Sequence, residues 1–356
     1  MRKYLVITFL LLLSIACSKQ EQYSGRHPRN VILLIGDGMG LAQVYAGWTA
    51  NGGSLNMERC SHVGLQKTYS SNAYITDSGA SGTAMATGVK TRNGAIGVDT
   101  AGNPVTSILE LAEMQGLASG LISTKSITDA TPASFIAHNR SRNFQEAIAA
   151  DFLKTDIDVI IGGGKSFFAG RKDGQNLLDT MKKNEYLVVE DIEELEGITS
   201  GKVVCLTDSI HCPPAGMGRG DMLPEATGHA LRILDQNSEG FFIMVEGAQI
   251  DGAGHANNTQ YLVSEVIDFD KAVGIALDFA EKDGETLVII TADHETGGMV
   301  ITGGDPATGH VEAVYGTGGH SAVMVPVFAW GPGAEQFTGI YENTEIFEKM
   351  RTALGL

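Results

Sequence analysis

Short apolar runs alternate with longer amphipathic stretches along most of the chain. Each run has the length and branched-residue content of a buried strand. The clearest runs are residues 30–36, 118–124, 158–164, 201–206, 240–247, 286–293 and 325–331. Apolar residues spaced three and four apart predict helices within residues 104–116, 174–186, 224–237 and 261–284. This alternation predicts an α/β fold whose central, largely parallel sheet is flanked by helices.

The patterned part of the chain is continuous. No internal repeat or Pro/Ser-rich linker divides it, so we expect a single domain over residues 30–356. The pattern is least regular in residues 165–225 and 300–320, where we expect surface excursions.

The first 29 residues do not fit this pattern. Arg2 and Lys3 precede an apolar run, residues 4–16, that is too short to span a bilayer and is typical of a signal peptide. The run ends in Ser-Ile-Ala-Cys, which resembles a bacterial lipobox with Cys17 as the lipidated residue. We therefore expect a lipoprotein signal peptide in residues 1–16, a tether in residues 17–29, and export to the periplasm or cell surface. The anchor at Cys17 would be the only membrane contact, and an ordinary signal peptide is the alternative.

Composition and net charge limit the kinds of binding partner that fit this chain. The 356 residues carry a formal net charge of −17, which argues against a nucleic-acid partner or an acidic membrane surface bound by charge. A phosphate site on such a protein needs a strong local positive charge. Among the other cysteines, Cys205 and Cys212 lie close enough in sequence to pair, but their spacing does not show that they do.

Metal-ligand residue types follow the predicted strands. In open α/β sheets, ligands bind beyond the carboxyl ends of the strands. The residues found there are Asp37, Asp129, Thr131, Glu246, Asp251, His255, Asp293 and His294, and His320 directly precedes the last apolar run. One such residue alone would be unremarkable. Several converging carboxylates, however, repel one another unless cations lie between them, and Asp with His suits zinc whereas Asp, Glu and Thr suit magnesium.

A candidate nucleophile lies in residues 76–91, TDSGASGTAMATGVKT. Small residues allow close packing of a helix that begins near Ser78, and the positive end of the helix dipole favours an alkoxide and an anionic substrate. The alternative is that Asp77 or Ser78 only caps the helix. The G-x-S-x-G pattern of serine hydrolases is absent around Ser78.

Six segments in order resemble the alkaline phosphatase family. They are GDGMG (36–40), TDSGASGTAMATGVKT (76–91), DATPASFIAHNRSR (129–142), VEGAQIDGAGH (245–255), TADHETGG (291–298) and GGHSAVMVPVFAWGPG (318–333). The resemblance implies a three-layer sandwich with a reduced crown region, and a homodimer. It also implies a metal-dependent phosphomonoester hydrolase of broad substrate range and alkaline pH optimum.

The resemblance also implies roles for residues. Ser78 would form a phosphoserine and Arg142 would bind the phosphate. Two Zn²⁺ and one Mg²⁺ would be held as follows: Asp251, His255 and His320 for the first zinc; Asp37, Asp293 and His294 for the second; Asp37, Thr131 and Glu246 for magnesium, with Asp129 close to the metal-bound waters. Gly252 departs from relatives that carry a basic or aromatic residue after Asp251, and we expect its missing side chain to open the pocket.

Two other functions fit the same residues. One is a phosphodiesterase or a nucleotide-selective phosphatase of the same superfamily. The other is a periplasmic binding lipoprotein on an inactive scaffold, which would normally have lost the nucleophile or a metal ligand. None of these positions is missing in this chain.

Overall fold

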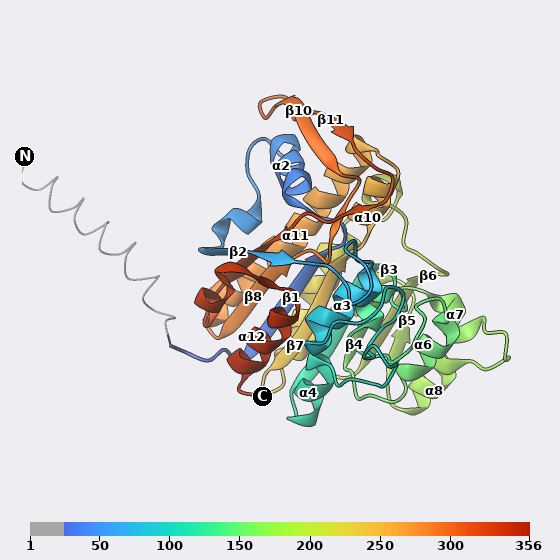
Figure 1. Cartoon of the computed structure of the whole chain (residues 1–356). Coiled ribbons are helices and arrows are strands. Elements are labelled where there is room, and N and C mark those ends of the chain that lie inside the picture. Colours follow the sequence, from blue (N-terminus) through green and yellow to red (C-terminus); the bar gives the residue numbers. More distant parts are fainter. Residues whose placement is uncertain (1–24) are drawn as a thin grey trace, which may run out of the picture.

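The computed structural model describes residues 25–356 and centres on a ten-stranded sheet (Figure 1). The predicted signal peptide, Cys17 and most of the tether lie outside the described residues. In spatial order the strands are β14 (Gly339–Glu342), β2 (His62–Lys67), β13 (Val325–Trp330), β8 (Thr286–Thr291), β1 (Asn30–Gly36), β7 (Phe241–Gly247), β3 (Ala118–Ser126), β4 (Val159–Gly163), β6 (Val203–Asp208) and β5 (Leu187–Val189). Only β13 pairs antiparallel with its neighbours, β2 and β8.

Both faces of the sheet are buried, which explains why its central strands are apolar throughout. In β1, Val31, Leu33 and Ile35 point into one hydrophobic core, whereas Ile32 and Leu34 point into the other. Successive side chains of a strand alternate between faces, so a strand between two helical layers has no polar face. The two cores confirm the predicted three-layer architecture.

Helices cover both faces. One core contains α2 (Leu41–Ala50), α9 (Met222–Leu234), α10 (Gln249–His255) and α11 (Thr259–Asp283). The other contains α3 (Ser78–Thr87), α4 (Ile108–Met114), α5 (Ala130–Ala133), α6 (Gln145–Asp151), α7 (Lys165–Ala169), α8 (Leu177–Lys183) and α12 (Thr344–Leu354). Within residues 25–356, no helix is both long and apolar enough to cross a bilayer.

The two regions of weak patterning differ in the structure. Residues 165–225 are not only surface excursions, because they supply β5 and β6 at one edge of the main sheet. Residues 300–320 do lie outside that sheet. They form most of a hairpin of β10 (Met299–Asp305) and β11 (His310–Tyr315), which projects at the top of Figure 1 and agrees with a reduced crown. Cys205 and Cys212 are buried free thiols.

Candidate active site

The strand order gathers the candidate residues at one edge of the sheet. Strands β8, β1, β7 and β3 are parallel neighbours, so their carboxyl ends lie side by side. Asp37 directly follows β1, Asp293 lies two residues beyond β8, and Glu246 is the last residue but one of β7. Asp129 follows β3 and precedes α5. Residues far apart in the sequence thus meet because their strands are adjacent.

Two groups of side chains at this edge have the geometry to hold a metal ion. Asp37, Asp293 and His294 form one group, and Asp251, His294 and His320 form the other. Within each group the possible ligand atoms lie within 4.8 Å of one another. The first group is the set expected for the second zinc ion. In the other group His294 stands where the sequence predicted His255.

His255 lies at the rim of this second group. It is one helical turn from Asp251 on α10, and its Nε2 is 3.2 Å from Asp251 Oδ1. Its ring centroid is 5.1 Å from that of His320, and its side chain is 42% exposed. The structure therefore brings His255 to the site, on the solvent side of the two buried groups.

Backbone carbonyls orient the outer imidazoles. His255 Nδ1 donates to the Gly318 carbonyl, and His320 Nδ1 donates to the Thr76 carbonyl, each at 2.8 Å. These bonds leave both Nε2 atoms facing Asp251. A ring nitrogen fixed by a carbonyl is the usual support of a metal-binding histidine, because it presents the other nitrogen as the ligand.

The buried carboxylates are short of partners. Asp37 Oδ1, Asp293 Oδ2 and Thr131 Oγ1 are buried, and none forms a hydrogen bond with the described residues. Burial, followed by repulsion from Asp293 and Asp251, raises the pKa of Asp37 well above its usual value. Burial and repulsion from Asp129 raise the pKa of Glu246 to about 8. Buried oxygens without donors, in a set of carboxylates and imidazoles, fit divalent cations.

The residues expected to hold magnesium affect one another, since Glu246 raises the pKa of Asp37. Ser123 Oγ donates to Glu246 Oε2 at 2.5 Å, which orients that carboxylate. A contact with Thr131 lowers the pKa of Glu246, although it does not offset burial. Asp37, Thr131 and Glu246 thus combine two carboxylates with a hydroxyl, a set that suits magnesium.

Ser78 is the first residue of α3 and does not cap it. Asp77 is the cap, since its Oδ1 accepts from the Ala80 amide at 3.0 Å. The buried Ser78 hydroxyl lies 3.3 Å from His294 Nε2, at the edge of both metal-type groups. The helix N-terminus and the cluster therefore meet at this oxygen.

Arg142 lies between two carboxylates. Its Nη1 is 3.3 Å from Asp77 Oδ2, and its Nη2 is 3.1 Å from Asp129 Oδ1. Burial would lower the pKa of Arg142, but Asp129 and Asp77 raise it, so the guanidinium stays charged. Asp77, which caps the helix that begins at Ser78, thus also positions Arg142, the residue expected to bind phosphate.

Sequence reasoning missed three polar side chains at this edge. Thr296 Oγ1 donates to Asp251 Oδ1 at 2.7 Å, Ser123 supports Glu246, and Lys125 Nζ lies 3.2 Å from Asp251 Oδ2. Thr296 follows the predicted strand 286–293, and the other two lie at the end of the strand predicted at 118–124. The strand-end rule that selected the carboxylates would also have selected Lys125.

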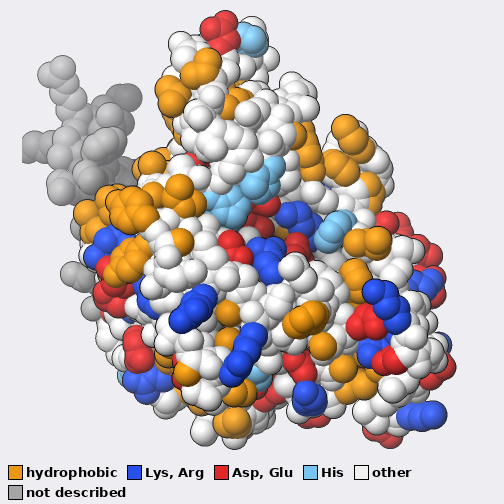
Figure 2. Space-filling model, turned by 45° about the vertical axis from the view of Figure 1, so that its right-hand side comes forward, with side chains coloured by type: hydrophobic (Ala, Val, Ile, Leu, Met, Phe, Trp, Pro, Cys, Tyr) orange, Lys and Arg blue, Asp and Glu red, His pale blue; other side chains and the backbone are white. Residues whose placement is uncertain are grey.

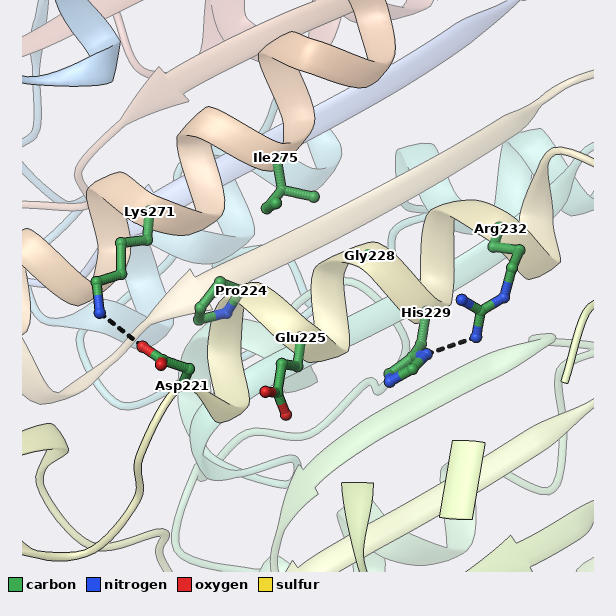
Figure 3. A pocket seen from close by; sticks show the side chains of 8 residues that line it. All are labelled: Asp221, Pro224, Glu225, Gly228, His229, Arg232, Lys271 and Ile275. Carbon is green, nitrogen blue, oxygen red and sulfur yellow. Dashed lines mark hydrogen bonds and ion pairs between the residues drawn. The ribbon is translucent and has the colours of Figure 1, made fainter. Parts of the chain in front are cut away.

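A groove elsewhere on the molecule differs in character. It lies between α9 and α11 (Figure 3), where Lys271 pairs with Asp221 and Arg232 contacts His229. Its other lining residues include Pro224 and Ile275. Lys271, Asp221, Arg232 and His229 are thus paired within this groove, whereas the candidate site residues lie at the strand ends. There, Figure 2 shows histidines in a hollow beside acidic and basic groups.

Comparison with known proteins identifies this arrangement. The alkaline phosphatase family matches residues 28–314 and 309–356. The chain belongs to the alkaline phosphatase family. It is 39% identical over 336 residues to alkaline phosphatase 4 of Bacillus subtilis, covering 89% of this chain and 72% of that protein. It is 32% identical to the streptomycin-6-phosphate phosphatase of Streptomyces griseus, covering 98% and 95% of the two chains.

Solved alkaline phosphatase structures agree with the fold. The enzyme of the Antarctic bacterium TAB5 superposes with a TM-score of 0.88 at 43% identity, covering 93% of this chain and 99% of that one. Mutants of that enzyme are described with Mg bound in the M3 site. The predicted family, fold and enzyme class are confirmed, and the chain is a metal-dependent hydrolase of phosphoric monoesters.

Proposed function

We propose that this alkaline phosphatase transfers the phosphoryl group of its substrate to Ser78 and then to water. The position of Ser78 Oγ carries the proposal. It lies at the start of α3, 3.3 Å from His294 Nε2 and beside two groups of metal-ligand type. The helix dipole favours an anionic substrate and a developing alkoxide at this point.

We assign the metals as the residue types suggest, with two Zn²⁺ in the acid–histidine groups and one Mg²⁺ at the third set. The first zinc ligands are Asp251, His255 and His320; the second are Asp37, Asp293 and His294; the magnesium ligands are Asp37, Thr131 and Glu246. Bound divalent cations would lower the pKa of a nearby hydroxyl and neutralise the attacking and leaving oxygens. The imidazoles are already oriented for this by Gly318 and Thr76.

Arg142 would bind the phosphoryl oxygens. Its guanidinium is held by Asp77 and Asp129 and suits a planar contact with two oxygens. Because neighbouring carboxylates raise its pKa, Arg142 keeps its charge at alkaline pH, where phosphate monoesters are dianions. This supports the proposed alkaline optimum, which a pH profile of turnover would test. Asp129 is assigned to hold Arg142 and to lie close to the metal-bound waters.

The decisive test is Ser78→Ala. We expect p-nitrophenyl phosphate turnover to fall by about three orders of magnitude or more while metal content stays constant, because the hydroxyl is the attacking group. Mass spectrometry of acid-quenched wild type should show phosphate on the peptide containing Ser78. The matched control is Ser238→Ala, an exposed serine remote from the site. Retained turnover in Ser78→Ala, with metals bound, would falsify the proposal.

The enzyme could act on many phosphate monoesters or select one of them. Broad specificity is our proposal, because the described site offers a phosphate-binding edge open beside His255. The similarity to a phosphatase named for streptomycin 6-phosphate supports a selective enzyme instead. Relative kcat/KM values for several monoesters and one diester would distinguish these functions. Broad specificity would be wrong if one monoester exceeded all the others by a thousandfold.

One exposed apolar surface supports a proposal about association. Exposed Tyr74, Ile75, Val323 and Met324 come from two segments that a His320–Thr76 hydrogen bond joins. Figure 2 shows hydrophobic side chains gathered beside the histidines. We propose that a second copy of the chain covers them in a homodimer, which light scattering would test.

We also propose export to the periplasm or cell surface with a lipid on Cys17. Acyl labelling of cells carrying wild type and Cys17→Ala would test this, and equal labelling would refute it.

A further inference from the structure

Lys125 is a buried basic residue that the proposed mechanism does not use. It lies near the end of β3, beside β7, and its side chain is 16% exposed. Its Nζ is 3.2 Å from Asp251 Oδ2, while Thr296 donates to Asp251 Oδ1. Its backbone amide donates at 3.0 Å to Ser123 Oγ, the hydroxyl that binds Glu246. Lys125 is therefore fixed at both ends by parts of the site.

Lys125 contacts one proposed metal set and is linked to another, because its ammonium pairs with Asp251 and its backbone amide binds the Ser123 hydroxyl that holds Glu246. Its contact with Asp251 Oδ2 is an ion pair. Burial lowers the pKa of Lys125, but the carboxylates of Asp37, Asp251, Asp129 and Glu246 raise it by more. Asp251 belongs to the first proposed zinc set, whereas Asp37 and Glu246 belong to the proposed magnesium set. One monovalent cation thus already compensates carboxylates that three divalent cations would otherwise share.

We propose that Lys125 is a built-in cation beside the third metal position and weakens the binding of a divalent ion there. The proposal rests on the metal assignment made above. An ammonium fixed near Asp37 and Glu246 repels Mg²⁺ and removes part of the negative charge that would attract it. Lys125 therefore sets how much of the enzyme carries a third metal at a given magnesium concentration.

Gly252 lies against polar side chains of α10 and α11. A Cβ at that position would meet Gln249 Oε1 at 3.2 Å and the Tyr261 hydroxyl at 3.4 Å. Gly252 has no side chain and adds no charge here. Lys125, on β3, is the first of the positive charges that lower the pKa of Asp129 against the effect of burial.

The test compares wild type with Lys125→Met, which keeps an unbranched side chain one atom shorter than lysine and removes its charge. Protein stripped of metal and reloaded with two equivalents of Zn²⁺ is titrated with Mg²⁺ in a calorimeter. We expect the Mg²⁺ dissociation constant of Lys125→Met to fall on the order of tenfold or more, because a repulsive charge has gone. Bound zinc, measured by elemental analysis, should remain at two ions per chain.

Two further variants make the result interpretable. Lys125→Arg keeps the charge, so its Mg²⁺ affinity should stay within about threefold of wild type. Lys165→Met removes a charge from a surface ion pair with Glu190 and should have no effect. Unchanged or weaker Mg²⁺ binding in Lys125→Met with zinc retained would overturn the proposal, as would a tenfold change in Lys125→Arg. The readout is binding, so absence of phosphatase activity would refute the proposed reaction and leave this inference standing.

Discussion

The molecule contains two buried clusters of acidic side chains that solve the same electrostatic problem differently. In the first, Arg219 Nη2 lies 2.5 Å from Glu265 Oε2 and 2.7 Å from Asp268 Oδ2, and these side chains are at most 4% exposed. Glu265 also accepts from the Ala215 amide at 2.8 Å. This cluster joins the segment before α9 to α11, and its carboxylates are satisfied by the protein itself.

In the cluster at the strand ends, the protein itself does not supply a partner for every carboxylate oxygen. Six carboxylates face two basic side chains there, and buried oxygens of Asp37 and Asp293 have no hydrogen-bond donor among the described residues. Lys125 and Arg142 are the two basic groups. The difference separates a cluster that stabilises the fold from one that binds cations, since uncompensated buried charge is costly unless a ligand supplies the balance.

Asp37→Asn should have the largest effect and tests whether the cluster at the strand ends binds cations. We expect loss of bound metal and a fall in turnover of roughly a thousandfold or more, because one carboxylate is shared by two proposed metals. The metal-free variant should nevertheless be more stable than metal-free wild type, since the substitution neutralises a buried charge whose pKa is raised by burial. Elemental analysis, p-nitrophenyl phosphate turnover and thermal unfolding of both forms would measure this. A metal-free variant less stable than its parent would contradict it.

Glu265→Gln tests the other cluster. Removal of one carboxylate leaves Arg219 with Asp268 alone, and we expect the free energy of unfolding to fall by about 3–5 kcal/mol. The loss should be equal with and without bound metal, because this cluster needs no cation. Urea unfolding of metal-free and metal-loaded protein would measure it. A loss confined to one of the two forms would show that the clusters are coupled and that the comparison is wrong.

The same contrast explains what the sequence could predict. Asp37, Asp293 and Glu246 were predictable because each ends or follows an apolar run, and parallel strands bring such ends together. The spatial order of the strands was not predictable from local pattern. Local pattern also did not predict that β13 runs antiparallel to its neighbours, or that the short strands β5 and β14 form the two edges of the sheet.

Side-chain partnerships were harder to predict than positions. The cap of α3 was ambiguous between Asp77 and Ser78, and only the contact of Asp77 with Ala80 assigns it. Lys125 had no visible role, because its partner Asp251 lies 126 residues away on α10. Such long-range charge pairs depend on which strands are neighbours, and one sequence does not specify that.

A smaller effect lies in a partly buried acid–base pair that needs no metal. Glu110 Oε1 lies 2.9 Å from His138 Nε2, and His138 Nδ1 donates to the Gly97 carbonyl at 2.6 Å. The hydrogen bond to Glu110 raises the pKa of His138, with Asp151 also contributing. Burial raises the pKa of Glu110, but His138 and the Ser107 amide lower it more. Unlike the metal cluster, this pair is complete only while its histidine is protonated.

The sign of its pH dependence follows from these shifts. The contribution of His138 is fully present below its ordinary pKa of about 6.5 and is lost as pH rises through the raised folded value, whereas that of Glu110 is lost as pH falls through its lowered one. His138→Gln should therefore cost about 1 kcal/mol near pH 6 and less near pH 9. Thermal unfolding at both values would measure this, with the exposed His310→Gln as control. An equal cost at both pH values would show that this pair acts by packing and that its charge does not contribute to stability.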